Sequence, residues 1–304
     1  MTSMAHASIA PQWGDFRFSH RLRVRWVEVD AQQVVFNGHY LTYLDVAVTE
    51  YWRAVGLPYP DAMRHVGGDI FVRRNMLEYH APARLDDWLD IGLRCERVGT
   101  SSITLQWAVQ AQGRLLVTGE VVYVFTDLAT GRAAPVPASV RAQLEAHEQG
   151  APVTRLQCGS WEALGDAARA VRLAVFVVEQ GIPEQEEWDA DDATAVHAVV
   201  SNLGGLPLAT GRLILSDGES GHPATTEHAA RIGRMAVLRS ARGRGLGAAV
   251  LQTLVAEARV RGVQRIDIHA QVTAMALYAK AGFLPEGEVF DEVGIPHQRM
   301  TLAL

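Results

Sequence analysis

The chain has 304 residues, of which 48% are hydrophobic and 20% charged, as in an ordinary globular protein with room for two domains. The formal net charge of -6 argues against a nucleic-acid partner, because binding to phosphate needs a concentrated excess of lysine and arginine. No apolar run approaches the roughly 18 residues that a membrane-spanning helix needs, and the first residues lack the features of a signal peptide, so we expect a cytoplasmic protein without a membrane span.

The two cysteines, Cys95 and Cys158, lie far apart and lack the spacing of a metal-binding pair. Neither a disulfide framework nor a zinc site is indicated. We expect both thiols to be reduced and structural, and we expect no metal.

The first predicted element is a strand over residues 21–29, where apolar residues alternate with arginine. From Tyr40 onward, apolar residues recur at spacings of three and four, which predicts one long helix that ends before Gly56. Four further strand-like runs follow, at residues 69–83, 87–98, 101–111 and 114–127. This order predicts an α+β domain in which an antiparallel sheet wraps around a single helix.

Residues 134–154 contain a Pro-rich entry, a short amphipathic helix and a Gly-Ala-Pro break, so they include the best linker candidate. After them the pattern changes to mixed helices and strands, and we see no internal repeat. We predict a strand after residue 154, a helix at 161–180, a hairpin at 195–215, a strand at 230–238, a helix at 242–262, a strand at 263–270, a helix at 272–282 and a strand at 297–304. The second half is therefore expected to be a three-layer α/β domain.

Asp30 is an isolated carboxylate in the loop between the first strand and the long helix. One interpretation is a turn-former or a helix N-cap, although Asn37 is better placed to cap a helix that begins around residues 37–39. The other is a catalytic base or nucleophile that acts on an acyl group whose oxyanion is held by amides at the helix N-terminus. On chemistry alone, the two interpretations are about equally supported.

Three stretches, VRWVEVDAQQVVFNGHYLTYLDVAVTEYW, LEYHAPARLDDWLDI and VVYVFTDLATGRAAPVP, resemble the hotdog-fold acyl-CoA thioesterases of the 4-hydroxybenzoyl-CoA thioesterase (YbgC-like) group. The resemblance covers roughly residues 17–146. It implies that Asp30 attacks the thioester or activates water, and that the Asn37 backbone N–H, with Gly38, polarises the thioester carbonyl. It also implies a homodimer or homotetramer, because hotdog sites usually form between two subunits.

Two departures from that family pattern stand near Asp30. The glycine that follows the aspartate in the family is replaced, since the sequence reads Gln32-Gln33, and the aromatic turn reads FNGH at residues 36–39. The shape of the substrate is therefore expected to differ. For His39 we favour a structural or substrate-lining role over that of a general base.

The predicted helix at residues 242–262 opens with a glycine-rich turn. Glycines let the backbone close around an anion, and the unsatisfied N–H groups and the dipole of the helix favour a pyrophosphate. The turn lacks the Lys-Ser/Thr of a P-loop and comes too late in the domain for a dinucleotide-binding motif. Its residues are Arg242, Gly243, Arg244, Gly245, Leu246 and Gly247.

Written as R-x-x-G-x-G, this turn matches the acetyl-CoA motif of GNAT N-acyltransferases. The stretches AVFVVEQGIPEQEEWDADD, IHAQ, ALYAKAGF and GEVFDEVGIPHQRM are similar to the ElaA-like branch of that family, over roughly residues 155–304. The resemblance implies that Tyr278 is the general acid, with plain helix packing as the alternative, and that Met235 and Val237 bind the pantetheine arm and acyl carbonyl through their backbones.

The residue that removes the amine proton is less clear from the sequence. Glu179 is the first candidate, acting through water. The acidic loop that contains Glu184, Glu187 and Asp189 can instead attract a cationic substrate. His297 lies in the matched GIPH stretch and is a candidate for contact with the substrate.

We therefore expect an N-terminal extension at residues 1–16, a hotdog thioesterase domain at 17–146, a linker at 147–154 and a GNAT acetyltransferase domain at 155–304. Both domains are expected to use acyl-CoA or acetyl-CoA as substrate, and the second an amine acceptor. Because hydrolysis would waste a shared donor, we expect different acyl specificities or one domain reduced to binding. The alternative from another class is a non-catalytic sensor of acyl-CoA.

Overall fold

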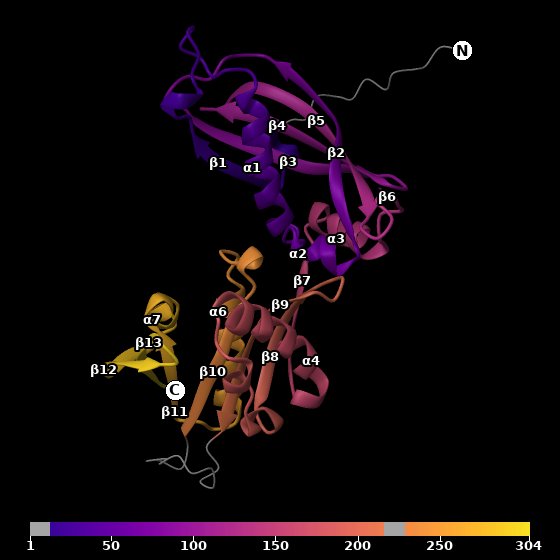
Figure 1. Cartoon of the computed structure of the whole chain (residues 1–304). Helices are drawn as coiled ribbons and strands as arrows, with labels where there is room; N and C mark the ends of the chain where they lie inside the picture. Colours follow the sequence, from indigo (N-terminus) through magenta and orange to yellow (C-terminus); the bar gives the residue numbers. More distant parts are fainter. Residues whose placement is uncertain (1–12, 216–228) are drawn as a thin grey trace. The chain divides into compact units, whose positions relative to one another are not determined.

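The computed structural model describes residues 13–215 and 229–304. The chain divides into two compact units, Met1–Val153 (unit 1) and Thr154–Leu304 (unit 2), and each is described by itself (Figure 1). Within the described ranges, no helix has the length and apolar character needed to cross a membrane.

Unit 1 is built on one antiparallel sheet with the strand order β1-β3-β4-β5-β2, to which the short β6 adds beside β5. Its elements are β1 (Phe18–Arg23), α1 (His39–Ala54), α2 (Asp61–His65), β2 (Gly68–Tyr79), β3 (Trp88–Val98), β4 (Ser102–Ala111), β5 (Arg114–Asp127), β6 (Arg132–Ala133) and α3 (Ala138–Glu148), with 3-10 turns at Trp13–Asp15 and Trp26–Glu28. The predicted order of one strand, a long helix and four strands is confirmed.

The sheet curves around α1, which packs its apolar face on the strands (Figure 1). The ring of Trp52 on α1 meets that of Tyr123 on β5 edge-on, with centroids 6.3 Å apart. Each large side chain buried in this way contributes about 1.5–3 kcal/mol to folding. The buried residues of the helix are Tyr40, Tyr43, Leu44, Ala47, Val48, Tyr51, Trp52 and Ala54.

The strand predicted at residues 21–29 ends earlier, at Arg23. In the β1–β3 ladder Arg23 lies opposite Trp88, where β3 begins, so later residues have no partner in the ladder. The chain turns instead into the 3-10 segment, and Trp26, which the alternation places inside, is 79% exposed. The prediction is wrong beyond Arg23 because alternation alone does not reveal where a partner strand ends.

Unit 2 is built on a sheet with the order β12-β13-β11-β10-β9-β8-β7, in which, among the described strands, only β10 and β11 are parallel. Its strands are β7 (Thr154–Gly159), β8 (Val196–Asn202), β9 (Pro207–Leu215), β10 (Ala229–Val237), β11 (Arg265–Gln271), β12 (Leu284–Glu292) and β13 (Ile295–Ala303). Its helices are α4 (Trp161–Arg172), a π-helical continuation (Leu173–Glu179), α5 (Glu184–Glu187), α6 (Leu246–Val260) and α7 (Met275–Lys280), with 3-10 turns at Ala190–Ala193, Arg239–Ala241 and Val272–Ala274.

The alternation of side chains along β8 shows that helices cover both faces of this sheet. Ala198 and Val200 pack in the cluster that contains α6, whereas Val199, between them, packs against Leu164 and Ala168 of α4. Successive residues of a strand point to opposite faces. The predicted three-layer arrangement is therefore confirmed. The sequence analysis did not predict β12, whose residues are almost all exposed and lack a buried apolar face.

The parallel strands β10 and β11 pair only over Ala229–Arg231 and then separate. On its other side β10 pairs with β9, with an irregularity between Gly233 and Ala236 where Arg234 has a φ of +52°. The later residues of β10 therefore have no ladder partner on the β11 side. This opening positions the candidate site of unit 2.

Candidate functional sites

Asp30 begins a tight loop whose two arms are held by backbone hydrogen bonds. The Asp30 N–H donates to the Val34 carbonyl at 2.9 Å, and the Phe36 N–H donates to the Glu28 carbonyl at 3.0 Å. Asp30 Oδ1 accepts from the Gln32 N–H at 2.8 Å, as in an Asx turn. Within the described residues, Oδ2 accepts no hydrogen bond. Oδ1 therefore forms the turn, as expected if Asp30 is a turn-former. Oδ2 stays available for a contact with a substrate or water.

The chain enters α1 directly after this loop, and the N-cap residue is Gly38, not Asn37. The prediction of an Asn37 cap is wrong because the entry is a turn in which the His39 N–H bonds the Phe36 carbonyl at 2.9 Å, and no side chain caps the helix. A Cβ on Gly38 would lie 2.8 Å from the Phe36 ring, so any other residue here would displace that ring. In the described part of the chain, the N–H groups of Asn37 and Gly38 have no acceptor, and they lie at the positive end of the helix dipole. His39 is half-buried, edge-on to Phe36.

The sequence analysis missed Glu28, which is only 2% exposed. Its carboxylate accepts from the Tyr43 hydroxyl on α1 at 2.8 Å and from the Arg25 backbone N–H at 2.7 Å and Nε at 2.8 Å. Burial works to raise the pKa of Glu28, but the hydrogen bonds from Arg25 and Tyr43 hold it below its ordinary value. Glu28 thus fastens the Asp30 loop to α1. Alternation along the first strand places Glu28 inside, and that was the available signal.

In unit 2 the predicted glycine turn connects β10 to α6. Gly243 and Gly245 have φ values of +80° and +76°, which suit glycine, and Gly245 is the N-cap of α6. A Cβ on either would meet nothing within 4 Å, so the backbone is open on that side. In the described chain, the N–H groups of residues 243–248, which include Arg244, Leu246 and Gly247, donate no hydrogen bond. These amides and the helix dipole form a site suited to a phosphate.

Arg242, the first residue of the turn, forms a two-pronged ion pair with Glu179. Its Nη1 and Nη2 donate to the two Glu179 carboxylate oxygens at 2.7 and 2.8 Å, and its Nε donates to the Val237 carbonyl at 3.2 Å. Glu179, at the end of the π-helical segment, does not line the cavity described next. The geometry places it as a partner of Arg242.

A cavity of about 330 Å³ opens where β10 and β11 separate. In the described chain, five residues that the sequence marks as candidates line it: Glu187, Asp189, Met235, Tyr278 and His297. Tyr278 is 5% exposed, and burial raises its pKa to about 12, so the phenol keeps its proton at neutral pH. Val237 does not line the cavity. The first turn of α6 lies nearby, since a Cβ on Gly247 would contact the Leu277 side chain at 3.6 Å.

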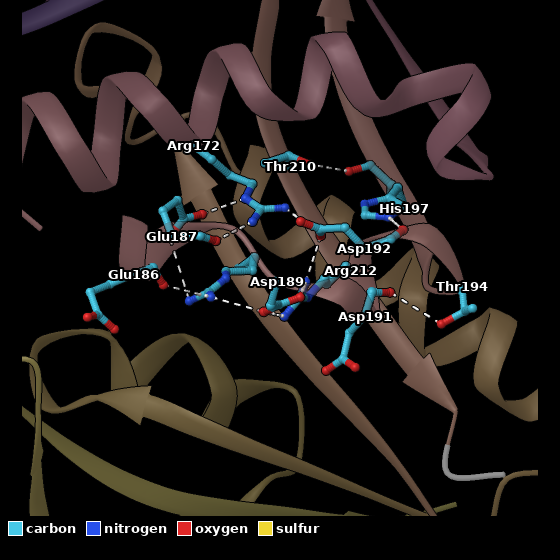
Figure 2. Close-up of polar contacts among 12 residues, drawn as sticks. Arg172, Glu186, Glu187, Asp189, Asp191, Asp192, Thr194, His197, Thr210 and Arg212 are labelled. Atoms are coloured by element: carbon cyan, nitrogen blue, oxygen red, sulfur yellow. Dashed lines mark hydrogen bonds and ion pairs between the residues drawn. The ribbon is translucent and has the colours of Figure 1, made fainter. Parts of the chain in front are cut away.

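Three carboxylates of the acidic loop, those of Glu187, Asp189 and Asp192, are bound by buried arginines (Figure 2). Arg172, 1% exposed, donates from Nε to Glu187 at 2.5 Å and from Nη1 to Asp192 at 2.7 Å. Glu187 is equally buried, and burial raises its pKa despite the arginines around it. Glu184 lies outside the cavity, and the Trp188 indole N–H donates to it at 3.4 Å.

Asp189 is held by two further arginines from neighbouring strands. Arg212 on β9 donates from Nη1 and Nη2 to its two oxygens at 2.5 and 2.6 Å, and Arg234 on β10 donates at 3.1 Å. Burial opposes ionisation, but the hydrogen bonds and charge of Arg212, then the charges of Arg234 and Arg172, lower the pKa of Asp189 to about 2. The expectation that Glu187 and Asp189 attract a cationic substrate is not supported, because arginines neutralise both.

Two other residues that the sequence analysis gave no role also line the cavity: His269 on β11 and Glu292 on β12. Nδ1 of His269 lies 3.2 Å from Oε2 of Glu292. The available signal was the alternation in RIDIHAQ, which buries Ile266 and Ile268 and places His269 on the other face.

Comparison with known proteins identifies the two units. The family model of the thioesterase-like superfamily matches residues 24–144, and that of the acetyltransferase (GNAT) domain matches residues 216–304. The chain is 34% identical over 132 residues to the uncharacterized N-acetyltransferase YjcF of Bacillus subtilis (strain 168), covering 43% of this chain and 86% of that protein. It is 32% identical over 92 residues to a protein of Aquifex aeolicus (strain VF5) that is provisionally named an esterase, covering 30% of this chain and 71% of that one.

The chain belongs to both families, as a fusion of a hotdog thioesterase-like domain with a GNAT domain. Among solved structures, it is similar to a thioesterase of Thermus thermophilus complexed with coenzyme A and zinc, at 28% identity and a TM-score of 0.40, covering 45% of this chain and 98% of that one. Both families act on CoA thioesters. Within the described residues, no three His, Cys, Asp or Glu side chains gather as a group able to hold a metal ion.

Proposed function

We propose that the protein has two CoA-thioester activities: unit 1 hydrolyses an acyl-CoA, and unit 2 transfers an acetyl group from acetyl-CoA to an amine. One observation carries the proposal. Each unit of this fusion combines a side chain able to take part in acyl transfer with backbone N–H groups that have no acceptor in the described chain. In unit 1 these are Asp30 and the amides of residues 37–38. In unit 2 they are Tyr278 and the amides of residues 243–248.

In unit 1, the Asp30 carboxylate either attacks the thioester carbonyl carbon or takes a proton from the attacking water. The carbonyl oxygen gains negative charge, which the N–H groups of Asn37 and Gly38 stabilise. The C–S bond then breaks with its electron pair on sulfur, which takes a proton. Where Asp30 is the nucleophile, this leaves a mixed anhydride that water hydrolyses. On either route the products are CoA and the carboxylic acid. Gly38 and His39 flank the acyl group.

In unit 2, the amides of residues 243–248 bind the pyrophosphate of CoA, and Arg242, held by Glu179, lies at the entrance of the turn. The pantetheine arm extends along the free edge of β10 and bonds the backbones of Met235 and Val237. The amine attacks the thioester carbonyl carbon, the C–S bond breaks, and Tyr278 donates its proton to the departing sulfur. His297 contacts the acceptor.

We further propose that unit 1 assembles as a homodimer or homotetramer through β2. This strand is at the edge of the sheet, so one side of its backbone is unpaired. Phe71 and Met76 on β2 are 54% and 53% exposed. A second copy that pairs along this edge would cover both, and sedimentation equilibrium would detect the assembly.

One observation favours a second candidate function, a non-catalytic acyl-CoA sensor. Asp30 Oδ1 is used to form the turn, which is a sufficient structural reason for an aspartate at this position. In that case unit 1 binds acyl-CoA without releasing free thiol.

The test for unit 1 is release of free CoA thiol from short, long and aromatic acyl-CoAs without any amine. Asp30→Asn should lower the rate by about 10²-fold or more, because it removes the general base or nucleophile. Asp86→Asn is the matched control: Asp86 also lies in a turn, with φ of +68°, and should behave as wild type. Equal hydrolysis by wild type and Asp30→Asn would refute the assignment of Asp30.

For unit 2, Gly245→Ala should weaken acetyl-CoA binding about tenfold, because alanine resists the left-handed backbone that presents the amides. Gly262→Ala, at the other end of α6 with φ of +75° and open space around its Cβ, introduces the same strain away from the turn. Calorimetry that shows equal affinities for the two variants would contradict the site. Tyr278→Phe should slow acetyl transfer without changing affinity.

A further inference from the structure

The cavity of unit 2 contains a group of ring side chains and one carboxylate, contributed by the three neighbouring strands β11, β13 and β12. His269 packs edge-on against Phe290, with ring centroids 5.0 Å apart, and Phe290 stacks on His297 at 6.1 Å. Glu292, on the same strand as Phe290, reaches His269. Both histidines and Glu292 line the cavity together with Tyr278.

The partners of the two histidines fix which ring nitrogen carries the proton. Nδ1 of His269 faces the Glu292 carboxylate at 3.2 Å, and Nδ1 of His297 faces the Ile295 carbonyl oxygen at 2.8 Å. Both partners are acceptors when Glu292 is ionised, so Nδ1 carries the hydrogen in each ring. In the neutral imidazole, Nε2 then has a free lone pair, and each histidine is able to accept a proton there.

The surroundings distinguish the two histidines. His269 is exposed to the cavity and is backed by a carboxylate, which stabilises the imidazolium that forms when a proton is taken. His297 is 9% exposed, and its Nδ1 faces a neutral carbonyl instead of a carboxylate. Three other acidic residues line the cavity in the described chain: Glu186, Glu187 and Asp189. Arginines bind Glu187 and Asp189, and the carboxylate of Glu186 makes no hydrogen bond to either histidine.

We propose that His269, oriented by Glu292, is the general base that takes the proton from the acceptor amine in the GNAT unit. This inference rests on the acetyl transfer proposed above. The amine nitrogen forms a C–N bond with the thioester carbonyl carbon and gives one proton to Nε2 of His269. The C–S bond breaks with its electron pair on sulfur, which takes the Tyr278 proton. His269 later releases its proton to water and Tyr278 regains one from water, so both groups are restored and the products are the acetylated amine and CoA.

The charges around this pair are consistent with that role. The hydrogen bond from His269 is the main cause that holds the pKa of Glu292 below its ordinary value, against burial, with smaller contributions from the charges of His269, His297 and Arg234. Arg299 is the register partner of His269 on β13, and its side chain is paired with Asp267 at 3.3 Å. Glu292 is therefore the carboxylate that faces the His269 ring.

The test measures thiol release from acetyl-CoA with spermidine, glycinamide, glucosamine or tyramine as the amine, between pH 5 and pH 9, using the full chain. His269→Gln should lower kcat/KM by about 10²-fold and remove the decline of the rate at acidic pH that protonation of the base causes. Glu292→Gln should lower kcat about tenfold, because the His269 ring loses the carboxylate that orients it. Acetyl-CoA affinity, measured by calorimetry, should be unchanged in both variants.

Glu288→Gln is the matched control, since Glu288 lies on the same strand as Glu292 and does not line the cavity. A His269→Gln enzyme with the rate and pH profile of wild type would overturn the proposal for His269 and leave the acetyltransferase assignment intact. A wild-type protein that binds acetyl-CoA but acetylates none of the four amines would count against the proposed transfer itself, and against His269 with it.

Discussion

The two candidate sites differ in how their residues are brought together. In unit 1 one loop and the first turn of α1 supply every candidate, and local backbone hydrogen bonds shape that loop. In unit 2 the cavity draws residues from the acidic loop, β9 to β13 and α7. Buried ion pairs connect α4 to the acidic loop and that loop to β9. A local site depends on turn conformation, whereas a dispersed site depends on the packing of the whole domain. Substitutions in each unit test this difference.

The largest effect is expected in unit 2 from Arg172→Met. The change removes the most buried partner of the Glu187 and Asp192 carboxylates and leaves only Arg234 and Arg212 beside them. Loss of one member of a buried ion pair costs about 3–5 kcal/mol. Pulsed hydrogen exchange after equilibration in urea should show lower stability for peptides of residues 154–215 and no change in unit 1. Arg169→Met, on the exposed side of the same helix, should cost less than about 1 kcal/mol. Equal effects of the two changes would refute the structural role of the network.

The corresponding change in unit 1 is Glu28→Gln. It removes the charge that strengthens the hydrogen bonds from Arg25 and Tyr43, and we expect a loss of about 2 kcal/mol. Because Glu28 fastens the Asp30 loop, thioester hydrolysis should fall as well. The same exchange experiment, applied to peptides that contain residues 26–38, measures the stability of the loop. Glu78→Gln, at an exposed position on β2, is the control. Unaltered exchange in this loop would show that Glu28 does not hold it.

A smaller effect is expected at acidic pH in unit 2. The pKa of Asp189 is about 2 in the folded protein, below its ordinary value of 3.8, so the folded state binds fewer protons at this group than the unfolded state. The contribution of the ionised Asp189 carboxylate to the free energy of unfolding is full above about pH 4 and is lost as the pH falls toward 2. Wild type should therefore exceed Asp189→Asn by about 1–2 kcal/mol at pH 6, after allowance for solvent screening, and the gap should close by pH 2. A gap that is constant over this range would contradict the assigned pKa.

The smallest expected change in stability comes from Gln33, where the Asp30 loop departs from the family pattern. Gln33 has a φ of +60°, a conformation that costs a side chain about 1 kcal/mol. Gln33→Gly should therefore raise the stability of unit 1 by about 0.5–1 kcal/mol, whereas Gln32→Gly should not. Urea denaturation of the two variants makes the comparison. A gain from Gln32→Gly that matches that of Gln33→Gly would show that the strain does not lie at residue 33.

The order of the elements in both units could be predicted from the sequence because apolar periodicity reports directly which side chains face a core. Tyr43 and Trp52 on α1 follow the helical period and are buried. Periodicity failed where a partner strand ends, as at Trp26, and where a strand has no buried face, as in β12.

The candidate residues of unit 1 were accessible to sequence reasoning because they lie within one short motif. The cavity of unit 2 was only partly accessible. Its glycine turn and Tyr278 lie in local motifs, but the partners of Glu187 and Asp189 come from other elements, Arg172 from α4 and Arg212 from β9. No local pattern reveals that Arg172 and Arg212 neutralise these carboxylates, or that Glu292 reaches His269.

Because hydrolysis by unit 1 would consume the donor of unit 2, we propose that the two units prefer different acyl groups. The most direct test is release of CoA thiol from acetyl-CoA and from longer and aromatic acyl-CoAs, with and without an amine, by wild type and Asp30→Asn. We expect Asp30→Asn to lose amine-independent release from the non-acetyl esters and to keep amine-dependent release from acetyl-CoA. Loss of both activities in this variant, or of neither, would contradict two separate CoA-thioester sites in one chain.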